Sequence, residues 1–221
     1  MLKCADMRYV IYLFCLLSAP LNGDTVALTP EAFGSVQDNP VNGIGDIVLA
    51  IPYIANAPEP FGNVYSAIVG YNASEFVGVT ATAAMLTGTI YANNFLDTGD
   101  RIIEALVFAG TGVVEPSDFQ ISAASLGVVS YHPPIDRSVS FAFDLLPEFQ
   151  ALIADGSQHV GVRFAGVNFQ APSQLNVDAL PILTVTTVPE PTSLLLLIGG
   201  LGVLALFRPR GKIPQPPFPS A

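Results

Sequence analysis

The amino-acid sequence predicts an all-β fold: a single antiparallel β-sandwich with one short helix, flanked by an N-terminal signal peptide and a C-terminal transmembrane helix. Three observations predict it. The middle of the chain contains short segments in which apolar and polar residues alternate, turns rich in Gly, Pro, Asn and Asp separate these segments, and each end carries an uncharged apolar run beside basic residues. Many short strands divided by such turns favour a sandwich or barrel over an alternating β/α fold.

The composition indicates a folded body with a sizeable core. The chain has 221 residues, of which 51% are hydrophobic and 12% are charged. An average soluble domain has roughly 25% charged residues, so this composition argues against disorder. Both cysteines, Cys4 and Cys15, precede the body, which we place at residues 24–187. The body can therefore form neither a disulfide nor a thiolate site.

The body is strongly acidic. It contains all 18 acidic residues of the chain except Asp6 and Glu190, but only three of the eight basic residues, Arg101, Arg137 and Arg163. Such a surface repels phosphate backbones, so nucleic acid is not an expected partner. The acidity is interpreted as a means of keeping an exported protein in solution, with calcium binding or a specific cationic partner as the alternatives.

Residues 1–23 have the layout of a secretory signal peptide. Lys3 and Arg8 precede an apolar run from Tyr9 to Leu17, and small and turn-forming residues follow. A basic start, about 7–15 apolar residues and a cleavage region define such peptides. The body is therefore expected to be exported.

Eight segments of the body are predicted to be strands. Residues 101–110 are apolar on both faces apart from Glu104, as in a central strand. Residues 138–146 and 159–169 alternate between apolar and polar or small residues, which indicates strands with one buried face. The other predicted strands are residues 46–54, 64–71, 76–86, 88–93 and 175–186.

One helix is predicted, over residues 147–156. Pro147 suits the first helical position, and Gly156 suits the position after the last turn. The apolar residues between them share one face at helical spacing. The size of the body fits one domain.

The body shows no recognised arrangement of catalytic residues, and no enzymatic activity is predicted. His132 is interpreted as a loop residue and His159 as the start of a strand, because their spacing does not suit a metal site. A nucleophile elbow, a P-loop and a dinucleotide-binding glycine motif are absent from the sequence. Glycosidase carboxylates are defined by distance rather than spacing, so a secreted glycoside-acting enzyme stays open as a distant alternative.

No cofactor or metal site is predicted, although two acidic loops could lend oxygens to Ca²⁺. One loop is Asp97-Thr98-Gly99-Asp100, and the other is Asp38-Asn39 together with Asp46. Neither matches the ligand spacing of a dedicated calcium loop. Turn formation is the simpler interpretation, since Asp and Gly build turns by themselves.

Carbohydrate binding is the main functional alternative. Sugar-binding platforms use flat aromatic side chains beside polar groups, but this chain has no tryptophan. Tyr65 and Tyr71 would share one face of a regular strand. Packing in the core or at an edge is the simpler role for both. The five tyrosines of the body are Tyr53, Tyr65, Tyr71, Tyr91 and Tyr131.

The C-terminal segment, residues 188–212, has three parts. Val188-Pro189-Glu190-Pro191 is followed by an uncharged run from Thr192 to Phe207 and then by a basic cluster, Arg208, Arg210 and Lys212. As a helix the run would extend about 24 Å, slightly less than the roughly 30 Å of a hydrocarbon core. The basic cluster is expected to stay in the cytoplasm. The two prolines disfavour helix ahead of the run, which leaves that peptide extended and accessible to a protease. A Pro-rich tail, residues 213–221, follows.

This three-part order closely resembles the PEP-CTERM sorting signal of Gram-negative bacteria. The resemblance implies recognition by exosortase, a membrane-embedded cysteine protease, followed by removal of the tail and release or transfer of the body. It implies that Val188, Pro189, Glu190 and Pro191 are recognised and that Arg208, Arg210 and Lys212 form the cytoplasmic stop. The order strand, helix, turn and strand over residues 138–169 also resembles the later part of jelly-roll-like domains that recur in PEP-CTERM proteins.

The expected function is that of a non-enzymatic structural or binding protein. It would be anchored transiently in the inner membrane and then reside at the cell surface or in an extracellular matrix. The expected partners are an exosortase-type membrane protease, the membrane during sorting, and extracellular polysaccharide. Two alternatives stay open: an uncleaved membrane anchor for the tail, and an extracellular carbohydrate-binding module for the body.

Overall fold

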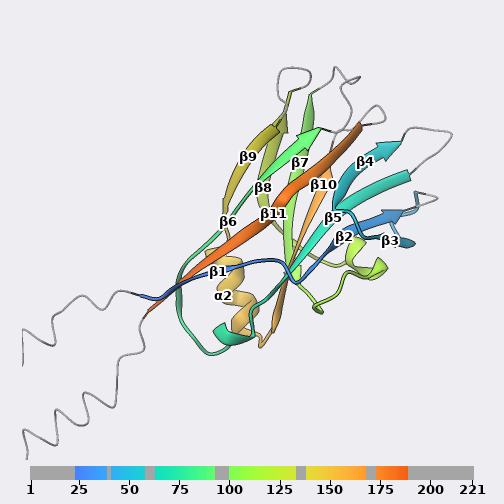
Figure 1. Ribbon diagram of the computed structural model, residues 1–221. Coiled ribbons are helices and arrows are strands. Elements are labelled where there is room, and N and C mark those ends of the chain that lie inside the picture. Colours follow the sequence, from blue (N-terminus) through green and yellow to red (C-terminus); the bar gives the residue numbers. More distant parts are fainter. Residues whose placement is uncertain are drawn as a thin grey trace, which may run out of the picture. The chain divides into compact units, whose positions relative to one another are not determined.

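The computed structural model describes residues 23–38, 41–57, 63–92, 100–132, 138–167 and 173–188 (Figure 1). The chain divides into one compact unit that ends at Val188 and a second unit, Pro189–Ala221, which lies wholly outside the described residues. Residues 1–22 also lie outside them. The predicted signal peptide, save its last residue, and the predicted transmembrane helix thus fall on parts of the chain that are not described.

The described body is mostly β-structure with one short α-helix, as the sequence predicts. Two 3-10 helices, η1 (Ser74–Phe76) and η2 (Pro116–Phe119), accompany the α-helix α2 (Leu146–Ala154). The strands are β1 (Thr25–Leu28), β2 (Ala32–Asp38), β3 (Ile47–Leu49), β4 (Tyr53–Ala57), β5 (Asn63–Asn72), β6 (Ala81–Ala92), β7 (Arg101–Ala109), β8 (Ala124–Tyr131), β9 (Ser138–Asp144), β10 (His159–Gly166) and β11 (Ser173–Thr187).

The strands form two antiparallel layers. The first layer has the order β3-β2-β5-β10-β7-β8, and the second has the order β9-β6-β11. Strands β4 and β1 share the remaining edge of β11: β4 pairs with its first four residues, and β1 pairs with its last four residues before Thr187 (Figure 1). Because β4 also pairs with β5, one hydrogen-bonded network runs through both layers.

The main hydrophobic core lies between the two layers. Alternate residues of β7, β9 and β10 point inward, and most of them are buried. The rings of Phe141 in β9 and Phe164 in β10 meet across the layers, with their centroids 5.3 Å apart. The hydroxyl of the buried Tyr71 in β5 donates a 2.7 Å hydrogen bond to the carbonyl of Pro181 in β11. Apolar packing and one polar contact therefore join the layers.

A second, smaller apolar cluster lies on the outer face of the first layer. Val36, Ile68 and Phe108 are buried there beneath apolar side chains of residues 114–123, the segment that contains η2. The ring of Phe108 lies over Gly161, its partner in the β7–β10 pair, where a Cβ would overlap with the ring. This glycine thus makes room for the aromatic ring that anchors the cluster.

The predicted helix and central strand are confirmed. Helix α2 buries Phe149 and Ile153, and Gly156 follows it with a positive φ of 82°. Strand β7 lies between β8 and β10 and matches the predicted segment 101–110 within one residue.

Three strand predictions are wrong in their boundaries. Residues 46–54 do not form one strand, because the chain leaves the ladder before Pro52 and divides into β3 in the first layer and β4 in the second. Proline lacks the N–H that a continuous ladder needs. Residues 76–86 and 88–93 do not form two strands either: η1 and a turn precede residue 81, and β6 then runs unbroken through Gly88.

Candidate functional site

The described residues end at the predicted sorting motif. The backbone N–H of Thr187 donates a 2.9 Å hydrogen bond to the carbonyl of Asp24, and that of Val188 donates a 3.0 Å bond to the carbonyl of Thr80. The side chain of Val188 is 43% exposed. The body therefore holds the chain on both sides up to the first residue of the motif. The other predicted site residues, Pro189, Glu190, Pro191, Arg208, Arg210 and Lys212, lie outside the described residues.

The two ends of the body lie side by side. Thr25 is paired with Thr186, and their hydroxyl oxygens are 3.1 Å apart. Gly23 lies so close to the carbonyl of Thr187 that a Cβ at position 23 would overlap with it. Both segments predicted to direct export thus leave the body from one place. No helix within the described ranges is long and apolar enough to cross a membrane.

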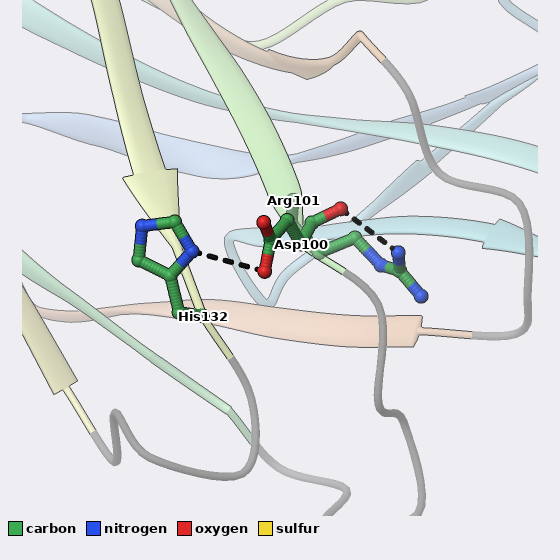
Figure 2. A network of polar contacts seen from close by, with 3 residues as sticks. All are labelled: Asp100, Arg101 and His132. Carbon is green, nitrogen blue, oxygen red and sulfur yellow. Dashed lines mark hydrogen bonds and ion pairs between the residues drawn. The ribbon is translucent and has the colours of Figure 1, made fainter.

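An exposed polar network lies where β7 begins and β8 ends. Figure 2 shows the carboxylate of Asp100 directed at His132, with 3.0 Å between Oδ1 and Nδ1. The guanidinium of the buried Arg101 donates a 3.0 Å hydrogen bond to the carbonyl of Asp100. The register that pairs Arg101 with Tyr131 brings these residues together. His132 is a loop residue and His159 begins β10, both as predicted.

The two candidate calcium loops are only partly described. Both carboxylate oxygens of Asp38 accept backbone hydrogen bonds, of 3.0 Å from Asn42 and 2.9 Å from Gly43, which makes this side chain the organiser of a turn. Asp46 donates its backbone N–H to Gln37 and so closes the β2–β3 connection. Asn39 and residues 97–99 lie outside the described residues. Within the described part of the chain, no three carboxylate, histidine or cysteine side chains gather as a metal site would require.

The tyrosines described here are mainly core residues. Tyr71 and Tyr131 are almost fully buried, and burial raises the pKa of the Tyr71 phenol far above its ordinary value. Tyr65, which shares the strand face of Tyr71, is half-buried. The expected packing role is thus confirmed for Tyr71. Tyr91 is half-buried on the outer face of β6.

A pocket of about 320 Å³ lies between α2 and the start of β6. No ionisable side chain lines the pocket. The side-chain amide of Gln150, which lines it, donates a 2.8 Å hydrogen bond to the carbonyl of Ala81. Its lining offers apolar contact and backbone groups but no acid or base. The lining residues are Gly78, Val79, Thr80, Ala81, Phe149, Gln150, Ile153 and Ala154.

The outer face of the second layer is rich in hydroxyl groups, and we name it the hydroxyl face. Its strands β1, β6, β9 and β11 contain no lysine or arginine. Asp144 adds a carboxylate at its edge. The hydroxyl groups come from Thr25, Thr87, Thr89, Tyr91, Ser138, Ser140, Thr184 and Thr186, which alternate with the inward-facing residues of these strands.

A partly buried polar tether, which sequence reasoning missed, holds η2 to the first layer. The Arg163 guanidinium donates hydrogen bonds to the carbonyls of Asp118, at 2.7 Å, and Phe119. The Asp118 carboxylate accepts a 2.9 Å bond from the backbone of Glu115. Burial raises the pKa of Asp118 and lowers that of Arg163. An arginine inside an alternating strand, in a body with only three, was the signal that could have found this contact.

No family model matches the chain, and no curated protein is significantly similar to it. Functional inference therefore starts from the residues of this chain.

Proposed function

We propose that this chain is an exported, non-enzymatic protein whose jelly-roll-like body is delivered by an N-terminal signal peptide and processed at a PEP-CTERM-like tail. The signal peptide would be residues 1–23 and the sorting segment residues 188–212. After transient anchoring in the inner membrane, the body would reside at the cell surface or in an extracellular polysaccharide matrix.

The position of the body's end carries this proposal. The compact unit ends at Val188, the first residue of the four-residue motif, and strand β11 is complete at Thr187. Its buried residues Val177, Leu183 and Val185 all precede the motif. Removal of the tail would therefore take no part of the core away, which is what a disposable address requires.

The chemistry of the tail supplies the rest of the argument. Val188 to Pro191 would be the element that an exosortase-type protease recognises, Thr192 to Phe207 would enter the bilayer, and the basic cluster would stop in the cytoplasm. Moving three cationic side chains across the hydrocarbon core is strongly unfavourable, which fixes the direction of insertion.

Intact-mass spectrometry of the protein recovered from its own host tests this proposal. We expect a chain that begins near residues 20–28 and ends near Val188 to Pro191. The matched control is the triple variant P189A/E190A/P191A, which should keep its tail while the body folds normally. A wild-type chain that still ends at Ala221 would identify the tail as a membrane anchor and contradict the proposal.

A second candidate function is binding of an uncharged polysaccharide by the hydroxyl face. Clustered hydroxyls exchange hydrogen bonds with sugar hydroxyls, and the absence of basic residues from its strands disfavours anionic polymers. The test is retardation of the native protein in gels that contain a neutral glucan. The double variant T87V/T184V should be retarded less than the wild type, and the loop variant T111V should be retarded as much as the wild type. Equal retardation of the wild type and both variants would contradict carbohydrate binding by the hydroxyl face. Shortening of the glucan chains would instead indicate a glycoside-acting enzyme.

A further inference from the structure

The last residues of β11, from Leu183 to Thr186, are paired along both edges of the strand. On one side it pairs with β6, ending with Thr187 opposite Ala81, and on the other it pairs with β1. Both terminal amides, those of Thr187 and Val188, are engaged with carbonyls of the body. Gly23 covers the carbonyl of Thr187. The last residues before the motif thus offer no free backbone edge.

Proteins that bind an extended peptide commonly do so by adding it to a strand edge through main-chain hydrogen bonds. The residues just before Pro189 cannot be bound in this way while the body is folded. Within the motif itself, Pro189 and Pro191 have no N–H, and the N–H of Val188 is already donated to Thr80. Of the three motif residues after Val188, Glu190 is therefore the one that has a backbone N–H.

Given the proposed sorting function, we infer that the folded body determines where and how fast the tail is cut. The cut falls at or beyond Pro189, because residues up to Val188 are held in the sheet. Its rate is limited by the absence of a spacer between β11 and the motif, since a protease must first free the end of β11 from both neighbours. Such local opening is a normal property of strand ends, and it requires that terminal hydrogen bonds break.

The decisive variant inserts Gly-Ser-Gly-Ser between Val188 and Pro189. The matched control places the same four residues after Pro191, where they add no spacer between β11 and the motif. Pulse-chase labelling in a host that has an exosortase should show tail removal faster by about tenfold in the first variant, because freeing two backbone hydrogen bonds is no longer required. Removal in the control should match that of the wild type or be slower.

A second measurement uses the full chain in detergent and a non-specific protease. The tail should be trimmed to a stable product that ends between Val188 and Pro191, with β11 intact. Trimming into residues 173–187, or equal rates of tail removal with and without the spacer before Pro189, would overturn the inference and leave the sorting proposal standing. If no variant loses its tail in the host, the sorting proposal fails and this inference fails with it.

Discussion

The first layer has two differently built faces. Its inner face packs against the second layer through a broad core of alternating residues, with Phe164 fully buried. Its outer face buries three residues, Val36, Ile68 and Phe108, under a loop segment rather than under another layer. The loop is held by hydrogen bonds from Arg163. Regular side-chain alternation builds the inner face, whereas one aromatic ring and a polar tether secure the outer one.

The largest difference between the faces should appear when an aromatic ring is removed from each. F164A should lower the free energy of unfolding by about 3–5 kcal/mol, because the ring is enclosed by both layers and the cavity cannot collapse. F108A should cost about half as much, since the loop segment can settle into the space. Urea denaturation of the body measures both. Equal losses would show that the outer cluster is as rigid as the core.

A smaller effect is expected from adding a methyl group beneath the outer ring. G161A should destabilise the body by about 1–3 kcal/mol, because the new Cβ would displace the ring of Phe108. Gly70, the partner of Gly161 in the β5–β10 pair, is the matched control. A Cβ at position 70 would meet Ala32 at 3.4 Å, which is ordinary contact, so G70A should be tolerated. A neutral G161A would mean that the ring is free to move.

The smallest effect concerns the polar tether. D118A should cost about 1 kcal/mol, because the backbone N–H of Glu115 loses its acceptor. D118N keeps an acceptor and removes a buried charge, so it should lose less than D118A at pH 7. Chemical denaturation at several pH values measures both variants. Equal losses in D118N and D118A would mean that the charge of Asp118, rather than its hydrogen bond to Glu115, holds η2.

The Asp118 carboxyl also makes the stability of the body depend on pH, in a direction that follows from its raised pKa. Burial raises the pKa of Asp118, so the folded state favours its protonated form. Its contribution to stability is therefore fully present below the unfolded-state pKa and is lost as the pH rises through the folded-state value. The wild type should gain stability relative to D118N as the pH falls through this range. A relative loss over the same range would contradict this sign.

The features that sequence could predict were those governed by local periodicity. The segments that became β9 and β10 alternate regularly, the segment that became β7 is a short apolar run, and α2 has its proline and glycine at the expected ends. Strand β8 was missed because Gly127 interrupts the pattern at a register shift opposite Ala105 and Leu106. Strand β1 was missed because four residues are too few to show a period, and β2 because residues of both parities are buried along it.

The candidate site also combines local features, which a sequence can reveal, with contacts between distant residues, which it cannot. The proposed sorting motif that begins at Val188 is a local pattern, so the sequence alone could suggest it. That the body holds Val188 through Thr80, and Thr187 through Asp24, depends on pairing between residues far apart in the chain. The tether from Arg163 to residues 118 and 119 is non-local in the same sense. Spacing along a sequence carries no information on such partners until the register of the strands is known.

The pairing of β1 with β11 has a consequence for biosynthesis. Strand β1 can pair only after β11 is present, because Thr25 is opposite Thr186 and β11 lies between β1 and β6. A chain that crosses the membrane from its N-terminus cannot close its second layer until residue 187 has emerged. Contacts between such distant residues form slowly. A chain exported in the proposed way would therefore need protection of its apolar strands, by chaperones or by the export machinery, until its final strand has crossed.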